Sequence, residues 1–131
     1  TAKKVEDKIK EEIKTLDYVP VVFISALTKQ RIYKVIDVAR HVHEERNKTI
    51  KTSDLNDAIL PEIQKNPPSS STGSEIKINY ITQVKSKPPV IVFFTNNPKL
   101  IQESYKRFLE RRIRNAFGFS GVPLSLQFRK K

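Results

Sequence analysis

Residues 19–27 form a nearly unbroken apolar run, Val-Pro-Val-Val-Phe-Ile-Ser-Ala-Leu, which limits the possible folds more than any other feature. Its β-branched residues favour a strand, and a strand that is apolar on both faces is typical of a parallel sheet covered by helices. The flanking segments 1–16 and 30–46 repeat apolar residues every three or four positions, which predicts two amphipathic helices. Residues 1–50 are therefore expected to form a helix, a buried strand and a helix of a parallel α/β domain.

A single strand of this kind has no sheet of its own, because its backbone N–H and C=O groups need neighbouring strands. We expect the remaining strands to lie upstream of residue 1, so that residues 1–50 are the C-terminal part of a larger domain. In the alternative interpretation, residues 21–26 join a sheet formed by the second half of the chain. That sheet is expected to leave one face to solvent, which suits a doubly apolar strand less well.

Residues 51–131 have the pattern of a separate α+β domain. Helical and alternating apolar patterns follow one another, with a polar Pro- and Ser-rich loop over residues 66–74. Their order is α-β-β-α-β, which predicts two layers, with helices on one face of a three-stranded sheet. The expected elements are a helix from residue 52, strands 76–84 and 90–94, a helix 98–117 and a strand 124–128.

Local signals add detail to this prediction. Thr52 or Ser53 is a suitable N-cap for the first helix, and Pro61 is expected to kink or restart it. Ile76, Ile78 and Tyr80 alternate along the first strand and are expected to share one face.

Nearly all of the net charge lies in the second half of the chain. Residues 76–131 carry twelve Lys or Arg and two Glu, a net charge of +10, whereas residues 1–75 carry a net charge of +1. Such a density of like charge is commonly tolerated because a phosphate backbone releases condensed counterions when a protein binds it. The alternative is a basic face that is only solvated.

The candidate phosphate contacts lie along the helix 98–117, at the C-terminus and at the edge of the sheet. Phe93, Phe94, Tyr105 and Phe108 are expected in the core, so recognition of a folded backbone is favoured over base stacking. The candidate contact residues are Lys77, Lys85, Lys87, Lys106, Arg107, Arg111, Arg112, Arg114, Arg129, Lys130 and Lys131.

Several other classes of function are disfavoured. No apolar run approaches the roughly 18 to 20 residues of a membrane span, so no membrane partner is expected. The absence of Cys removes disulfides and thiolate metal sites and fits a cytoplasmic protein. His41 and His43 point to different sides of one helix, so we expect no metal site and no catalytic residue in this chain.

Motifs for GTP hydrolysis are missing from these residues. There is no G-x-x-x-x-G-K-[ST] loop, no D-x-x-G, and no N-K-x-D, since Asn47-Lys48-Thr49 is followed by Ile50. The letters of a KH-type G-x-x-G loop occur at Gly118-Phe-Ser-Gly121, but between a helix and a strand. There we expect a helix C-cap with a buried Phe119.

Dense motifs of the second half resemble the EngA (Der) family of bacterial ribosome-assembly GTPases, which have two tandem G domains and a C-terminal KH-like domain. Upstream, Ile24-Ser-Ala-Leu-Thr28 is similar to the fifth G motif of the second G domain, although Lys29 stands where the family usually has Gly. The matching motifs are Lys77-Ile-Asn-Tyr80, Thr82-Gln83, Pro88-Pro89, Val92-Phe-Phe94, Asn96, Glu103-Ser-Tyr-Lys-Arg-Phe-Leu109, Arg112-Ile-Arg114 and Phe117-Gly-Phe-Ser-Gly-Val-Pro123.

The resemblance implies that residues 1–50 are the end of a P-loop G domain and residues 51–131 a KH-like domain. It places Ser25, Ala26 and Leu27 against the guanine base. It implies GTP and Mg²⁺ as cofactors of the parent protein, with none in this chain, and two partners, the upstream G domains and ribosomal RNA of the large subunit. The leading hypothesis is RNA binding coupled to nucleotide state. The alternatives are a protein-docking module and, disfavoured by the incomplete sheet, an autonomous RNA-binding protein.

Overall fold

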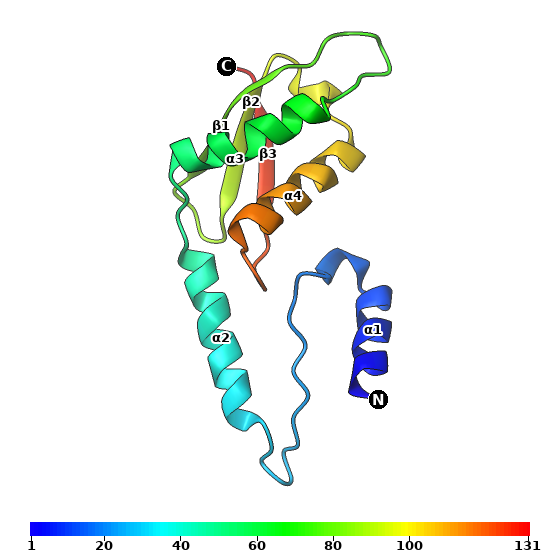
Figure 1. Cartoon of the computed structure of the whole chain (residues 1–131), viewed down its shortest axis with the longest axis vertical. Coiled ribbons are helices and arrows are strands. Elements are labelled where there is room, and N and C mark those ends of the chain that lie inside the picture. Colours follow the sequence, from blue (N-terminus) through cyan, green and yellow to red (C-terminus); the bar gives the residue numbers. More distant parts are fainter.

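The computed structural model describes every residue from 1 to 131. Four α-helices and three strands follow one another in the order α1, α2, α3, β1, β2, α4, β3 (Figure 1). The bounds are α1 Ala2–Glu12, α2 Ile32–Asn47, α3 Thr52–Lys65, β1 Ile78–Val84, β2 Val90–Thr95, α4 Glu103–Phe117 and β3 Ser125–Arg129, with short 3-10 turns η1 Lys14–Leu16 and η2 Pro98–Leu100.

The three strands form one mixed sheet in the order β1-β2-β3. β1 runs antiparallel to β2, and β3 runs parallel to β2 because α4 carries the chain back across the sheet. α3 and α4 lie on the same side of the sheet (Figure 1) and share one hydrophobic core with it. The predicted fold class, a two-layer α+β unit with the order α-β-β-α-β, is confirmed.

The core fills the space between the sheet and these two helices. All sixteen buried residues lie between Leu55 and Val122, so the stabilising burial belongs to this unit. Each buried Leu, Ile or Phe side chain contributes about 1.5 to 3 kcal/mol relative to an exposed one. The core cluster consists of Leu55, Ile59, Ile63, Ile76, Ile78, Ile81, Ile91, Phe93, Ile101, Leu109, Ile113 and Phe119.

A β-bulge in β1 changes the faces that its residues occupy. Ile78 is opposite Thr95 and Tyr80 is opposite Phe94, so Asn79 is an extra residue on β1. Ile81, opposite Phe93, therefore takes the core position, and Tyr80 lies on the other face with 41% of its surface exposed. The expectation that Tyr80 shares a face with Ile76 and Ile78 was wrong, because strict alternation fails at a bulge.

Two helix predictions also need correction. α3 does not restart at Pro61, since the helix runs continuously from Thr52 to Lys65. Its N-cap is Lys51 and not Thr52 or Ser53. The Thr52 hydroxyl instead lies 3.1 Å from that of Thr82. The predicted helix 98–117 is divided, since Ile101 is extended and separates η2 from α4.

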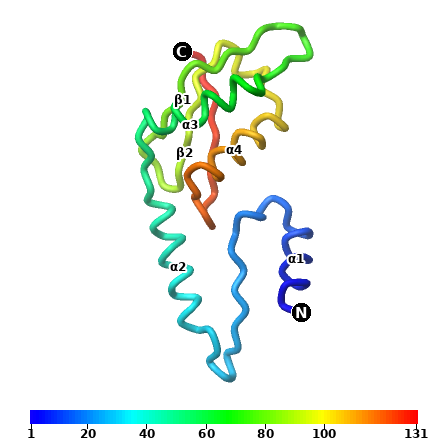
Figure 2. Tube along the Cα trace, viewed as in Figure 1, coloured from blue at the N-terminus to red at the C-terminus, as the bar shows by residue number.

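Residues 1–50 contain no buried residue. A long extended segment joins α1 to α2 and runs between them in Figure 2. It belongs to no sheet, because no strand lies beside it; Ser25 and Gln30 form only an isolated bridge. The predicted buried strand 19–27 is therefore not formed, and its side chains remain accessible, Ile24 at 49%. No helix has the length and apolar character needed to cross a membrane.

Candidate nucleic-acid interface

Most of the predicted basic contact residues have no acidic partner. Eight residues of the second half carry cations without a carboxylate within 4 Å, and one of them, Lys99, was not among the predicted contact residues. Because no carboxylate of residues 1–75 pairs with these cations, the positive charge remains available to a polyanion. The eight are Lys85, Lys87, Lys99, Arg107, Arg111, Arg129, Lys130 and Lys131, all exposed.

Three predicted residues pair with carboxylates at the surface. Lys77 lies 3.5 Å from Glu75, and Lys106 lies 3.0 Å from Glu103. Arg112 lies 3.6 Å from Glu62 of α3 and 5.2 Å from the ring centre of Phe108. Exposed pairs of this kind contribute roughly 0 to 1 kcal/mol, so these three cations can exchange partners at little cost.

Arg114 has a structural environment instead. Its side chain is only 15% exposed and pairs with Glu110 at 3.1 Å. Its Nη1 and Nη2 donate to the carbonyl oxygens of Phe119 and Val122, both at 2.9 Å, and the guanidinium lies 4.1 Å from the ring centre of Tyr18. Arg114 therefore holds the turn between α4 and β3, whereas the predicted contacts Arg107 and Arg111 of the same helix face solvent.

Lys85 and Lys87 lie in a groove of about 500 Å³ between the end of α2 and the β1–β2 turn. Arg46 and Lys48 line its other wall, and no acidic residue lines it. The Gln83 side chain joins the walls, because its amide donates to the Lys48 carbonyl at 2.9 Å and its oxygen accepts from the Ile50 N–H at 2.8 Å. The groove is thus braced by hydrogen bonds and positively charged.

Arg46 was missed by the sequence reasoning. It is exposed, has no carboxylate partner, and belongs to the half of the chain that is nearly neutral. Charge counting along the chain separates Arg46 from Lys85, although the fold places both residues in one groove. No local signal in the sequence identifies it.

The end of α2 is fastened to the turn between α4 and β3 by contacts that we call the α2 clasp. The Glu45 carboxylate accepts from the Phe119 N–H at 2.9 Å and pairs with Lys48, and the Lys48 ammonium donates to the Phe117 carbonyl at 2.6 Å. The Gly121 N–H donates to the Tyr18 carbonyl at 3.0 Å. The turn at residues 118–121 is thus held by Glu45, Lys48 and Tyr18 of the same chain. Phe119 is fully buried, as expected.

Glu45 is the charged centre of the clasp. Desolvation raises its pKa, but the hydrogen bonds from Lys48 and from the Phe119 N–H, with the charges of Lys48 and His41, outweigh desolvation. The pKa of Glu45 consequently lies below its ordinary value of 4.5. The carboxylate is ionised at neutral pH and attracts both Lys48 and the Phe119 amide.

The predicted guanine-contacting turn is exposed. The Ser25 hydroxyl accepts from the Thr28 N–H at 3.2 Å, and the Ser25 N–H donates to the Gln30 carbonyl at 3.2 Å. The N–H groups of Ala26 and Leu27 have no acceptor in the protein, and Leu27 is 94% exposed. Lys29 has a φ of +57°, a left-handed conformation that Gly adopts at lower cost.

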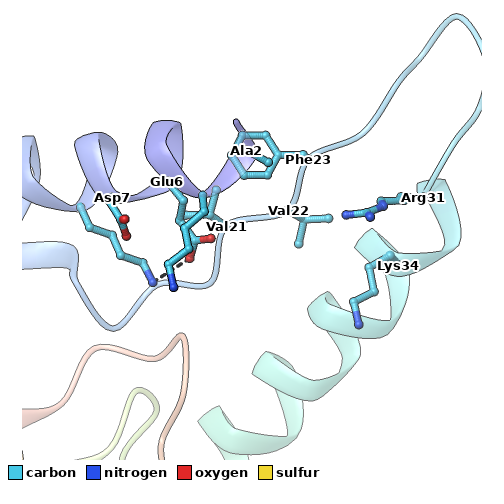
Figure 3. Close-up of a pocket in the computed structure, with 10 residues that line it drawn as sticks. Ala2, Glu6, Asp7, Val21, Val22, Phe23, Arg31 and Lys34 are labelled. Carbon is cyan, nitrogen blue, oxygen red and sulfur yellow. Dashed lines mark ion pairs between the residues drawn. The ribbon is translucent and has the colours of Figure 1, made fainter.

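A second hollow, of about 440 Å³, lies between α1, the extended segment and α2 (Figure 3). Basic side chains line it together with Glu6 and Asp7, and Lys10 pairs with Glu6 at 2.8 Å. The hydrogen bond from Glu6 and its charge raise the pKa of Lys10. The lining includes no Ser, Thr, Cys or His.

The two-layer α-β-β-α-β unit, from α3 to β3, defines the class of this part of the chain, which is a KH-like domain. A family model described as the KH-domain-like region of EngA bacterial GTPase enzymes, C-terminal, matches residues 49–129, and the chain belongs to this family.

Curated relatives are similar to this protein along its whole chain. It is 53% identical to the GTPase Der of Chloroherpeton thalassium, 47% identical to that of Chlorobium phaeobacteroides and 44% identical to that of Halalkalibacterium halodurans. Each similarity covers 100% of this chain and 30% of the relative. The chain therefore spans less than a third of the length of these relatives.

Proposed function

We propose that residues 76–131 bind structured ribosomal RNA of the large subunit through their unpaired cations. The main support for this proposal is that eight exposed Lys and Arg residues of this half have no carboxylate within 4 Å. Each cation that meets a phosphate releases condensed counterions, which supplies affinity without reading sequence. Arg114 is excluded from this set, because its guanidinium is used inside the protein.

Two groups of cations can bind phosphates at different places on the surface of the protein. Arg107 and Arg111 follow each other at a spacing of four on α4 and project from the exposed side of the helix. Lys85 and Lys87 form one wall of the groove, with Arg46 on the other wall. A folded RNA presents phosphates at many separations, so both groups can engage one molecule.

The test is a salt titration of RNA binding by the 131-residue chain, with a large-subunit ribosomal RNA fragment as the probe. The logarithm of the affinity is expected to fall linearly with the logarithm of the salt concentration. Arg107→Ala with Arg111→Ala, and separately Lys85→Ala with Lys87→Ala, should each weaken binding and reduce the slope by about 2, or about 1 per lost phosphate contact.

A matched control is Lys4→Ala with Lys8→Ala on the exposed side of α1, which removes the same charge elsewhere. This variant should retain the wild-type slope. Loss of affinity of equal size in all three double variants would show a diffuse attraction and would reject the proposed surface. No measurable binding by the wild type would reject RNA as the partner.

We further propose that this unit reports the nucleotide state of G domains in a parent GTPase with GTP and Mg²⁺ as cofactors. The relatives are named GTPases, and the free N–H groups of Ala26 and Leu27 suit a guanine carbonyl. The α2 clasp connects the helix after that turn to the KH-like unit.

The clasp also favours a second candidate function, in which the second half is chiefly a docking module for its own upstream domains. One predicted RNA contact, Arg114, already packs against Tyr18 of the first half. If docking is the function, the double variants in the groove and on α4 should leave RNA affinity unchanged.

A further inference from the structure

The bulge in β1 creates an aromatic surface on the face of the sheet opposite α3 and α4. Because Asn79 is the extra residue, Tyr80 points away from the core and lies opposite Phe94 of β2. Their ring centres are 5.9 Å apart with a tilt of 38°, and neither residue belongs to the core cluster, so the expectation that Phe94 lies in the core was wrong. Tyr80 is 41% exposed and Phe94 is partly exposed, so one aromatic pair is open to solvent.

A cation continues this row across the sheet. Phe94 is in register with Arg129 of β3, so Tyr80, Phe94 and Arg129 lie side by side on three adjacent strands. Strands are roughly 4.8 Å apart, and the row therefore spans about 10 Å. Arg129 has no carboxylate within 4 Å, and its Nη2 donates to Gln127, two residues before it on the same face of β3, at 2.7 Å.

This combination suits a nucleobase better than a protein side chain. An unpaired base presents a flat π-face for an aromatic ring and is attached to a phosphate that a guanidinium attracts. Arg can also stack on a planar ring. An acidic peptide would satisfy Arg129 and the following Lys130 and Lys131, but its carboxylates gain nothing from two exposed rings.

We propose that Tyr80 and Phe94, with Arg129 beside them, form a stacking site for an unpaired base of RNA. The proposal rests on the RNA binding proposed above and adds a contact of a different kind. The groove and α4 attract phosphates, whereas the sheet face holds one base that is displaced from a helix or loop of the RNA.

The test compares a short single-stranded oligoadenylate with an RNA duplex of equal length as probes for the 131-residue chain. Tyr80→Ala should weaken oligoadenylate binding by about 5- to 150-fold, which is the range for loss of one stacked base, and should leave duplex affinity unchanged. Tyr80→Phe should keep the affinity, and Tyr80→Leu, which remains apolar and bulky, should lose it. No variant removes a charge, so all should keep the wild-type salt slope.

The matched control is Tyr33→Ala, since Tyr33 is 81% exposed on α2 and lies outside the sheet. A 2-aminopurine base placed in the oligoadenylate should lose fluorescence on binding the wild type and keep it with Tyr80→Leu. Unchanged oligoadenylate affinity in Tyr80→Ala and Tyr80→Leu would overturn the stacking site. Salt-dependent binding of the duplex in the same experiment would still support the proposed function. No binding of either probe by the wild type would overturn both proposals.

Discussion

Glu45 is the residue on which the connection between α2 and the KH-like unit most depends. It accepts the Phe119 N–H and pairs with Lys48, and its side chain is only 13% exposed. We predict that Glu45→Ala accelerates hydrogen exchange at the Phe119 amide by roughly 5- to 150-fold at pH 6, because an unpaired polar group costs about 1 to 3 kcal/mol. NMR-detected exchange measures this directly. Glu44→Ala, a change at an exposed neighbour without a pairing partner, should leave the rate unchanged.

The same carboxylate predicts a pH dependence. The pKa of Glu45 is lowered in the folded protein, so its charge stabilises the clasp above the ordinary value of 4.5 and this stabilisation is lost as the pH falls through the lower folded pKa. Glu45→Gln keeps an acceptor for the Phe119 amide but cannot titrate. We expect the ratio of exchange rates between Glu45→Gln and wild type to be about fivefold at pH 6, or about 1 kcal/mol, and to approach one well below pH 4.5. A ratio independent of pH would contradict the role of the charge.

At the scale of elements, α3 closes the free edge of β1 through Asn56. The Asn56 amide nitrogen donates to the carbonyls of Thr52 and Ile81, both at 2.7 Å, and its oxygen accepts from the Ile81 N–H at 2.9 Å. This side chain satisfies the outer backbone groups of Ile81 as a further strand would, and it blocks pairing with another chain.

We predict that Asn56→Ala lowers the free energy of unfolding by about 1 to 3 kcal/mol, because Ile81 is fully buried and its N–H loses its acceptor. Urea denaturation followed by circular dichroism measures the change. Asn56→Asp should be no better, since it can accept from the N–H but cannot donate to either carbonyl. Asp57→Asn, at the exposed next position, should change stability by less than about 0.5 kcal/mol. Equal stability of Asn56→Ala and wild type would show that water replaces the lost bonds.

For the whole molecule, Gly121 reports whether the first 50 residues are held against the KH-like unit. A Cβ at Gly121 would lie 2.5 Å from a Val42 methyl carbon and 3.1 Å from the Pro20 Cδ, and the residue has a φ of +75°. Gly73 has the same φ, and a Cβ there would have no neighbour within 4 Å. The two glycines therefore separate backbone strain from packing.

We predict that Gly73→Ala costs about 1 to 2 kcal/mol of unfolding free energy through backbone strain alone. Gly121→Ala should cost about 1 to 3 kcal/mol more, because the new methyl group meets a packed surface. Urea denaturation of both variants measures the difference. Equal costs would mean that α2 and Pro20 move away freely, and the proposed coupling through the clasp would fail.

Local patterns in the sequence were sufficient for the element order and for the location of the charge. Apolar spacing predicted helix α3 and strands β1 and β2, because the period of a helix or strand is set by neighbouring residues. The alternation of apolar residues could not predict the face of the sheet on which Tyr80 lies. One extra residue in β1 moves each residue that follows it to the opposite face. The apolar run also predicted a strand at residues 19–27, which is not formed in this structure. A strand needs a neighbouring strand as well as suitable residues of its own.

Composition and periodicity are properties of the chain before it folds, and they were sufficient to predict an α-β-β-α-β unit with a strongly basic second half. Which of these cations are free depends on the folded structure. Arg107 and Arg114 are equivalent on a helical wheel of basic residues, yet one faces solvent and the other binds two carbonyls of the following turn. Those carbonyls converge on Arg114 only when the turn after α4 folds, and the Tyr18 ring, 4.1 Å from its guanidinium, belongs to a distant part of the sequence.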